Sequence, residues 1–394
     1  MPAQQPKKII IIGGGIVGSA TAYFLTRHAN YDPELHSIVM LEASSIAVAS
    51  SGKAGGFLAS WATPKCLAPL SFKLHQSLAQ EHQGDKLWGF RPVYAAEVEL
   101  QADEIDARNL HLPPRPGISD DRPSDLDWLL PGSVTEYNEI STPSDSAQVH
   151  PYLLTNKLAQ LAEASGAAIV IGTATSIDYS PDGSSVASVT YTSQGETTVL
   201  EATDVLVAAG PWSSKLLPQV KLLAPKGHSI VIQPSRDPIS PYILFPKIHA
   251  ANPILSPEIY PRPKDTINDF ETFYASGPDY YDVPLPDLAA QVTTEQEKCD
   301  DVWHAVRTVS QEIRDGKIIT SQACYKAQVR KHADGEEAGP IVGPLPVTGL
   351  WLATGLDEWG IQNGPGVGLV MSEFILEGRA TSADVGALDP KHWI

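Results

Sequence analysis

The chain has 394 residues, with 46 acidic side chains against 28 lysines and arginines, and its formal net charge is −18 at pH 7. Because a surface this acidic repels phosphate backbones and anionic lipids, neither a nucleic-acid partner nor a membrane partner is expected. The hydrophobic content of 42% with eight tryptophans excludes a disordered chain, and the length suffices for two or three domains.

The spacing of cysteines and histidines excludes further classes. The three cysteines form no CxxC pair, which excludes a cysteine zinc site and is typical of a reducing compartment. The eleven histidines show no HExxH or HxH spacing, so no metal centre is expected. There is no apolar run near the ~18 residues of a membrane span, no recognisable signal peptide and no terminal Ser-Lys-Leu. We therefore expect a cytoplasmic protein, and the sequence leaves its oligomeric state open.

In chain order, the sequence begins with a βαβ unit. Residues 7–12 form a β-branched run that predicts a buried strand, residues 16–27 have helical spacing, and residues 36–41 predict a second strand that ends at Glu42. Two more elements follow, a helix over 67–82 and an alternating strand over 90–100.

Two irregular stretches interrupt this pattern. Residues 101–147 are acidic and rich in proline and predict an irregular surface segment, and recurring prolines make helix improbable over 233–286. Regular elements return elsewhere, with helices over 151–166, 293–314 and about 366–377 and strands over 167–172, 186–191, 204–209 and 349–354. The alternation of regular elements with irregular stretches predicts a discontinuous nucleotide-binding domain of residues 1–90, 145–225 and 318–394. The inserted domain would comprise residues 91–144 and 226–317.

The strongest motif is G-x-G-x-x-G at Gly13, Gly15 and Gly18, between the first strand and the first helix. These glycines permit a tight turn, a close approach to a diphosphate and close packing of helix on strand, and the helix N-terminus favours the anion. Glu42 ends the second strand, and its carboxylate can accept hydrogen bonds from two ribose hydroxyls and would repel a 2′-phosphate. The motif therefore predicts the adenosine half of FAD or NAD rather than NADP.

Three further loops of small residues favour FAD. They lie at residues 50–56, 209–213 and 354–366, the first after the second strand and the others after apolar strands. A cofactor as long as FAD is usually bound by several such loops, whereas NAD needs one crevice.

Together these motifs resemble the FAD-dependent D-amino-acid oxidase superfamily, which includes glycine oxidase and sarcosine oxidase. The resemblance covers most of the chain and rests on the glycine motif, Glu42, the Ser-Ser-Gly loop and the sequences VLVAAGPWS, PKGHS, CYKAQVR, GPIVG and LATGLDEWGIQNGPGVG. The spacing is closest to a fungal-type branch of oxidoreductases without an assigned substrate. It implies an α/β fold class, in which a Rossmann-type FAD-binding domain carries an inserted antiparallel-sheet substrate domain, and non-covalent FAD.

The motifs and the resemblance also indicate which residues would bind FAD. They are Gly13, Gly15, Ile16, Val17, Gly18, Glu42, Ala43, Ser50, Ser51, Gly52, Ala209, Gly210, Trp212, Gly355, Trp359, Gly360, Ile361 and Gln362.

Family members remove a hydride from the carbon that bears an amine, and the resulting imine hydrolyses. In the amino-acid oxidases, an arginine before the PIVG-like stretch binds the substrate carboxylate, and Lys326 stands in its place here. Because lysine lacks the planar fork of arginine, Lys326 is either a weaker carboxylate anchor or a solvated cation on a strand edge. Arg330 is a nearby alternative.

Lys53 and His228 complete the catalytic candidates. Lys53 lies where a basic residue in some relatives activates oxygen, with a surface lysine as the alternative, and His228 is either beside the flavin or structural. Cys324 lies near the cysteine that carries the flavin in the sarcosine oxidase branch, but its flanking residues do not match, so a buried thiol is expected. Asp357 and Glu358 either favour a cationic amine or point to solvent.

The functional hypothesis is an FAD-dependent oxidase or dehydrogenase that oxidises the C–N bond of an amino acid or of a secondary or other small amine. Two alternatives stay open. One is a flavin-binding protein with mainly a trafficking or interaction role, and the other is a biosynthetic flavoenzyme that acts on a larger amine or an alcohol.

Overall fold

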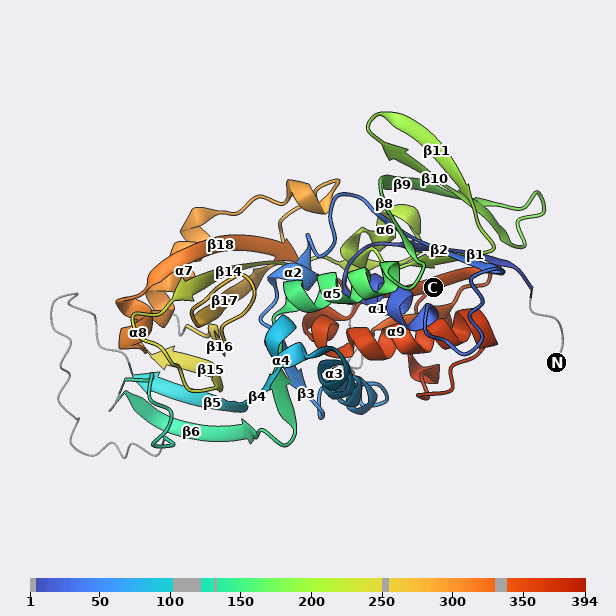
Figure 1. Ribbon diagram of the computed structural model, residues 1–394. Coiled ribbons are helices and arrows are strands. Elements are labelled where there is room, and N and C mark those ends of the chain that lie inside the picture. The colour runs from blue at the N-terminus through green and yellow to red at the C-terminus, as the bar shows by residue number, and fades with distance from the viewer. Residues whose placement is uncertain (1–4, 102–121, 131–132, 250–254, 330–338) are drawn as a thin grey trace.

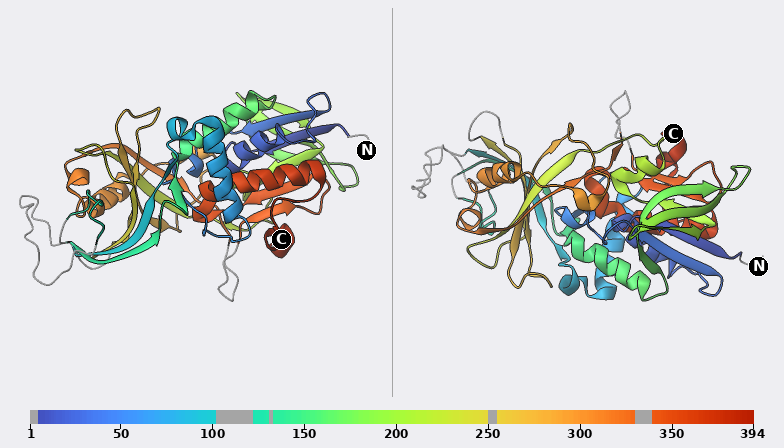
Figure 2. Two further views of the ribbon diagram at one scale, coloured as in Figure 1. Left: turned by 60° about the horizontal axis from the view of Figure 1, so that its bottom comes forward. Right: turned by 90° about the horizontal axis from the view of Figure 1, so that it is seen from above.

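The structure, a computed structural model, describes residues 5–101, 122–130, 133–249, 255–329 and 339–394. These residues form two lobes, each built on its own large sheet (Figure 1). The two further views in Figure 2 show the lobes lying end to end, so the molecule is elongated. Among the described residues, no helix is both long enough and apolar enough to cross a lipid bilayer.

The first lobe, called the α/β lobe, contains a six-stranded sheet in the order β20-β21-β12-β1-β2-β8. Its strands are β1 (Lys7–Ile12), β2 (His36–Glu42), β8 (Ala168–Ile171), β12 (Asp204–Val207), β20 (Ile341–Pro344) and β21 (Leu350–Thr354). Neighbouring strands are parallel except for the pair of β20 and β21. This is the Rossmann-type arrangement that the sequence predicts.

Both faces of this sheet are covered, which explains the unbroken apolar sequence of β1. Ile9 and Ile11 pack among the helices α1 (Ile16–Leu25), α3 (Ala68–His82), α5 (Pro151–Glu163) and α9 (Gly360–Glu377). Ile10 and Ile12 pack on the other face, toward a three-stranded sheet of β9 (Thr173–Tyr179), β10 (Val186–Ser193) and β11 (Glu196–Glu201). Alternate residues of one strand therefore serve two cores.

The second lobe, called the β lobe, contains a seven-stranded sheet in the order β18-β14-β17-β16-β15-β5-β6. Its strands are β5 (Tyr94–Gln101), β6 (Val134–Ser141), β14 (Lys226–Gln233), β15 (Tyr242–His249), β16 (Glu258–Arg262), β17 (Thr272–Tyr280) and β18 (Lys317–Tyr325). The pairs are antiparallel except for β5 with β15. Ile230 and Ile232 face the helices α7 (Gln296–Val306) and α8 (Gln311–Arg314), whereas Val231 belongs to the core on the inner face, toward the α/β lobe.

The remaining elements are short. They are α2 (Ser50–Lys53), α4 (Gly84–Leu87), α6 (Ser213–Leu216), β3 (Phe57–Ala59), β4 (Arg91–Pro92), β7 (Ser146–Gln148), β13 (Leu222–Leu223), β19 (Gln328–Val329), and the 3-10 turns η1 (Gly210–Trp212), η2 (Ala289–Gln291), η3 (Asp357–Trp359), η4 (Gly386–Leu388) and η5 (Pro390–His392).

Several expectations need correction. The interval 101–147, expected to be irregular, contributes β6 and β7, because proline and acidic composition obscure short alternating strands. The single helix expected over 293–314 is two, since Ser310 interrupts it and caps α8 by accepting a hydrogen bond from the Ile313 N–H. The domain boundaries remain a prediction, but β18 hydrogen-bonds to β14 in the β lobe, whereas the boundary at residue 318 assigns it to the FAD-binding domain.

Helix α9 begins at Gly360, several residues before the expected start near residue 366, despite Pro365 in its second turn. Proline has no N–H to donate to the Ile361 carbonyl one turn earlier. The imidazole of His75 on α3 lies 3.0 Å from that carbonyl oxygen and 3.2 Å from the Gln362 carbonyl oxygen through Nε2. The Gly366 N–H donates to Ser71 Oγ at 2.8 Å. Side chains of α3 therefore replace the backbone hydrogen bonds that Pro365 interrupts.

This arrangement makes His75 a determinant of stability and of its pH dependence. Burial lowers the pKa of His75 to about 4, so the folded protein keeps the ring neutral at pH values where the unfolded chain protonates it. The free energy of unfolding should therefore fall as the pH drops from about 6.5 towards 4, by up to about 1.4 kcal/mol per pH unit.

The substitution His75→Leu should lower the free energy of unfolding at neutral pH by about 1–3 kcal/mol, because two buried carbonyl groups lose their donor. It should also flatten the pH dependence, because the ring no longer titrates. Urea unfolding of both proteins at neutral and mildly acidic pH measures both effects. Equal pH slopes for the two proteins would contradict this role of His75.

Candidate functional site

Two adjoining cavities lie at the carboxyl ends of the parallel strands, where α/β sheets bind their ligands. The first is lined by the turn after β1, the end of β2 and the loops after β12 and β21. The second, of about 510 Å³, lies between the inner face of the β lobe and the α/β lobe. The cavities meet at the four residues that line both, Ser50, Ser51, Asp357 and Gly360.

The turn between β1 and α1 depends on glycine at two positions. Gly13 has φ = +113°, a conformation that L side chains rarely adopt. A Cβ atom at Gly18 would lie only 1.9 Å from the Gly13 carbonyl oxygen, so a larger residue could not pack there. These glycines let α1 begin directly beneath the first cavity.

Gly15 precedes α1 and borders the first cavity. A Cβ atom on Gly15 would meet no protein atom nearer than Ser51 Oγ, at 3.0 Å. The same Ser51 oxygen accepts a hydrogen bond of 2.9 Å from the Ile16 N–H. Because the first N–H groups of a helix have no partner within the helix, this end of α1 offers backbone donors to an anion in the cavity.

Glu42 lies at the end of β2, where its carboxylate is fixed by the backbone. Its Oε2 accepts a hydrogen bond of 2.7 Å from the Gly14 N–H, and its Oε1 accepts one of 3.0 Å from the Ser44 N–H. Each carboxylate oxygen has lone pairs left for further donors, such as two hydroxyl groups. The side chain therefore provides a positioned acceptor at the rim of the first cavity.

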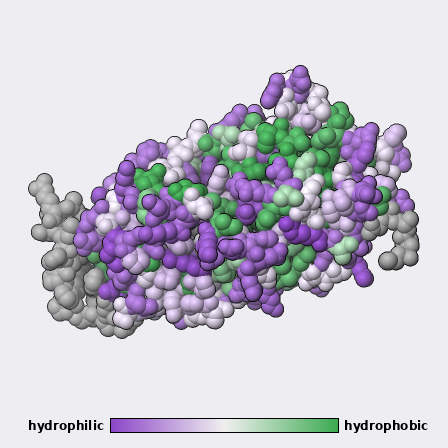
Figure 3. Space-filling view, in the orientation of Figure 1, coloured by the Kyte–Doolittle hydropathy of each residue, from purple (hydrophilic) through white to green (hydrophobic). Residues whose placement is uncertain are grey.

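The far wall of the first cavity comes from segments distant in sequence. Trp212 donates from Nε1 to the Pro286 carbonyl at 2.9 Å, and the Lys215 ammonium group pairs with Asp287 at 2.7 Å. These contacts hold residues 286–289, which follow the β-lobe strand β17, against the cavity. Figure 3 shows hydrophobic residues gathered on this part of the surface, around α6, β8 and β9.

The second cavity has a distinct chemical lining. One wall is aromatic, with Phe57, Trp61, Phe245, Tyr260, Tyr274 and Trp359. Carboxylates are also frequent in it, at Glu97, Glu258, Asp279, Asp357 and Glu358.

Lys326 lines the second cavity, but its ammonium group is already paired. Nζ lies 2.8 Å from Asp279 Oδ2 and 3.4 Å from Glu358 Oε1. Burial lowers the pKa of Lys326, but the two carboxylates outweigh that effect and raise it above the ordinary value. The side chain is three-quarters buried, so it differs from both sequence alternatives, the free anchor and the solvated cation. Arg330 lies outside the described residues.

His228 on β14 also lines the second cavity. Its Nε2 donates to Glu295, which also pairs with the buried Lys226 at 2.7 Å. Burial lowers the pKa of His228 despite the nearby Glu295 carboxylate, which favours the neutral ring. Its Nδ1 is buried and has no hydrogen-bond partner among the described residues.

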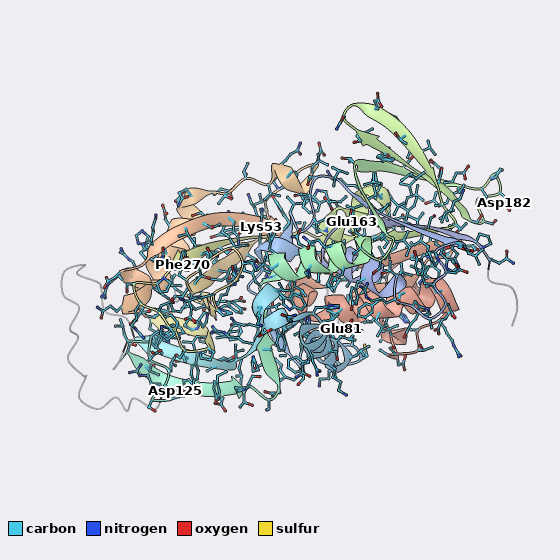
Figure 4. The ribbon with its side chains drawn as sticks, viewed as in Figure 1. Lys53, Glu81, Asp125, Glu163, Asp182 and Phe270 are labelled. Carbon is cyan, nitrogen blue, oxygen red and sulfur yellow. The ribbon has the colours of Figure 1, made fainter. Side chains whose placement is uncertain are left out.

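The structure does not bring Lys53 to the lining of either cavity. Figure 4 shows Lys53 on α2 beside the β18 strand, and its ammonium group donates to the Ala323 carbonyl at 2.9 Å. Lys53 therefore links α2 to the β lobe. Cys324 lines the second cavity, and burial raises the pKa of its thiol to about 11, so the reactive thiolate is disfavoured.

Asp357 occupies the meeting point of the two cavities. Its backbone has φ = +48°, and its Oδ2 accepts a hydrogen bond of 2.9 Å from the Gln328 side chain. Its Oδ1 is buried without a partner among the described residues. Burial raises the pKa of this carboxyl group, against the effect of Gln328.

Comparison with known proteins decides what this arrangement is. The model of the FAD dependent oxidoreductase family, DAO, matches residues 8–374. The chain belongs to this family. Among curated proteins it is 31% identical to the provisionally named oxidoreductase C1F5.03c of Schizosaccharomyces pombe, with 98% of each chain covered. It is 28% identical to TDA3 of Saccharomyces cerevisiae, also provisionally named an oxidoreductase, over 99% of this chain and 95% of that protein.

Solved structures show the same fold. Glycine oxidase from Bacillus cereus superposes with a TM-score of 0.71 at 21% identity, covering 94% of this chain and 95% of that enzyme. The fold class inferred from the sequence is therefore confirmed.

The cofactor of the family is FAD, and the first cavity fits it. The bare backbone at Gly15 and the N-terminus of α1 would hold the diphosphate, and Glu42 would hold the adenosine ribose. The N–H donors and the fixed carboxylate match the anionic and hydroxyl-bearing parts of the cofactor.

Most of the predicted FAD-binding residues line the cavities. The first cavity takes in Gly13, Gly15, Ile16, Val17, Glu42, Ala43, Ser50, Ser51, Ala209, Gly210, Trp212, Gly355 and Gly360. Trp359 and Ile361 line only the second.

Three predicted FAD-binding residues line neither cavity. Gly18 packs under the turn, and Gly52 could not carry a Cβ, which would lie 2.0 Å from the Ala47 carbonyl oxygen. Gln362 hydrogen-bonds to the backbone of Ala59 and Ala68 and so joins α9 to neighbouring segments. We assign all three a structural role, because close packing around a cofactor loop produces the same residue pattern as contact with the cofactor.

Sequence reasoning missed the wall made by Thr173, Ala174, Lys215, Leu216 and residues 287–289. These residues belong to no recognisable motif, and only the fold brings them to the cavity. Glu258 was missed for the same reason.

The glycine motif yields a matched pair of variants. Gly15→Ala should fold with only a small shift of Ser51, whose Oγ lies 3.0 Å from the added methyl group, and should bind FAD at least about tenfold more weakly, because that group borders the first cavity. Gly18→Ala should instead reduce soluble, folded protein, because its methyl group clashes with the Gly13 backbone. Thermal unfolding and FAD titration of the two apoproteins separate these effects. Unchanged FAD affinity in Gly15→Ala would contradict the assignment of the diphosphate site.

Proposed function

We propose that this protein oxidises the C–N bond of an amino acid or a small amine by hydride transfer to FAD. The observation that carries the proposal is the junction of the cavities at Ser51 and Asp357, which lets a small molecule in the second cavity reach a cofactor held in the first. The similarity to glycine oxidase supports the same class of reaction.

The reaction balances as follows. The substrate carbon loses a hydride, the nitrogen loses a proton, and a C=N bond forms, which water hydrolyses to a carbonyl compound and a free amine or ammonia. Bound FAD would supply the hydride acceptor for this step, and dioxygen or another acceptor would take up the two electrons.

The chain's own residues would bind and orient the substrate. The aromatic wall, including Phe57 and Trp359, would exclude water from one side of the second cavity. The carboxylates offer acceptors to a cationic nitrogen, and Glu258 is held in place by the Tyr260 hydroxyl at 2.6 Å. A cavity of about 510 Å³ is the size of a small-molecule site.

The direct test is anaerobic mixing of the FAD-loaded protein with a panel of amines and amino acids. At least one compound should bleach the visible flavin absorption and yield the matching carbonyl product. Protein that dithionite reduces, but that no amine or amino acid in the panel reduces, would contradict the proposed function.

The flavin should be bound without a covalent link, because the buried thiol of Cys324 does not favour the thiolate. Acid precipitation of the loaded protein should leave the yellow colour in the supernatant, and Cys324→Ser should retain FAD. Colour that stays in the wild-type pellet and leaves the Cys324→Ser pellet would overturn this expectation.

A further inference from the structure

The second cavity carries an excess of negative charge. Among the described residues that line it, the five carboxylates named above face a single lysine, Lys326, and one histidine, His228. Burial keeps the pKa of that histidine low, so it adds no positive charge, and burial also raises the pKa of Glu258 and Asp357. The lining therefore favours a cationic ligand over an anionic one.

The cavity also lacks a free cation for a substrate carboxylate among the described residues that line it. The ammonium group of Lys326 is bound to Asp279 and Glu358. The guanidinium group of Arg262 does not line the cavity, and it donates to the Ala54 carbonyl and the Gly55 carbonyl, the latter at 3.0 Å. A carboxylate entering this cavity would have to compete with two existing carboxylates for Lys326.

Glu258 differs from the other carboxylates of the lining. Asp279 is paired with Lys326, Asp357 accepts from Gln328, and the side chains of Glu97 and Glu358 are exposed. Glu258 is only partly exposed, and it accepts hydrogen bonds from Tyr260 and Ser276 through Oε2. No lysine, arginine or histidine among the described residues forms an ion pair with it, although the nearby Lys326 ammonium group lowers its pKa electrostatically, and no described donor reaches its Oε1.

The aromatic wall adjoins this carboxylate. Tyr260 contacts Phe245 edge-on at 6.1 Å between ring centroids, Phe245 contacts Phe57, and Phe57 contacts Trp359. Aromatic faces beside a carboxylate attract organic ammonium groups through the ring quadrupole as well as by charge. His228 on β14 adds a ring whose pKa is lowered by burial to the same lining.

On the basis of the proposed amine oxidation, we infer that the substrate is an organic ammonium compound that carries no carboxylate. We also infer that Glu258 binds its nitrogen. Lys326 then serves to neutralise Asp279 rather than to anchor a substrate. Specificity follows from the unpaired carboxylate and the aromatic wall, which together exclude amino acids.

Binding of two unreactive probes tests the inference without turnover. Benzyltrimethylammonium and benzoate are titrated into the FAD-loaded protein, and the change in the flavin spectrum gives each dissociation constant. The cation should bind at least about tenfold more tightly than benzoate. Tighter binding of benzoate would overturn the inference.

Two variants test whether the Glu258 carboxylate causes the preference for the cation. Glu258→Gln keeps an oxygen for Tyr260 but removes the charge, and it should weaken cation binding about tenfold with the FAD content unchanged. The matched control is Glu163→Gln on the exposed end of α5 (Figure 4), which lines neither cavity and should leave both constants unchanged. Cation affinity that is equal in wild type and Glu258→Gln would contradict the role of Glu258.

Lys326→Met separates the two readings of the lysine. The variant should bind the cation more tightly, because Asp279 loses its partner. If it instead loses benzoate binding and gains no affinity for the cation, Lys326 is a carboxylate anchor, and the inference is overturned. If Glu258→Gln fails to fold, the ratio of the two dissociation constants in the wild-type protein and the binding by Lys326→Met still test the inference.

Reduction of the flavin distinguishes this inference from the proposed function. Benzylamine should reduce the loaded protein faster than glycine, sarcosine or proline. Faster reduction by these amino acids would overturn the inference and leave the proposed function standing. Preferential cation binding without reduction by any compound would contradict the proposed function while supporting the charge preference.

Discussion

Helix α1 packs against strand β1 so closely that no side chain fits between Gly18 and the Gly13 carbonyl. This contact lets the helix start immediately after the strand and directs its free N–H groups at the first cavity. It also lets α1 pack on α9, where a Cβ on Gly368 would meet Ala20 at 2.6 Å. The turn that forms the cofactor site is therefore also a place where backbone segments of the α/β lobe pack closely.

The position of α9 has a second consequence. Helix α9 begins at Gly360, beside the junction of the two cavities. The hydrogen bonds that His75 and Ser71 form with its first turns therefore also fix the preceding segment, which carries Asp357 and Trp359. Contacts in the core of the α/β lobe thus help to position the residues at the boundary between the two cavities. The β lobe completes that boundary from the other side, through the inner face that presents Glu258 and Tyr260.

The two cavities offer different groups to a ligand. The first offers backbone dipoles at a helix N-terminus, together with a glutamate already bonded to the backbone, and so accepts an anionic cofactor with hydroxyl groups. The second concentrates carboxylates and aromatic rings. For ligand binding, the few carboxylates of the second cavity therefore matter more than the net charge of −18 of the whole chain.

The local parts of this architecture were predictable from the sequence. The glycine turn and Glu42 follow from short-range patterns, because strand, turn and helix N-terminus are adjacent in the chain. The start of α9 was not predictable, because it depends on His75 from a distant helix replacing the hydrogen bond lost at Pro365. Nor was Glu258, which lies in an interval whose prolines hide the strand β16 and which reaches the cavity only through the sheet order.

The measurement that tests this account most directly is a crystal structure of the protein with FAD and benzyltrimethylammonium. The account predicts the FAD diphosphate at Gly15 and the N-terminus of α1, and the ammonium group in the second cavity beside Glu258. FAD bound elsewhere, or the cation bound outside the second cavity, would contradict it.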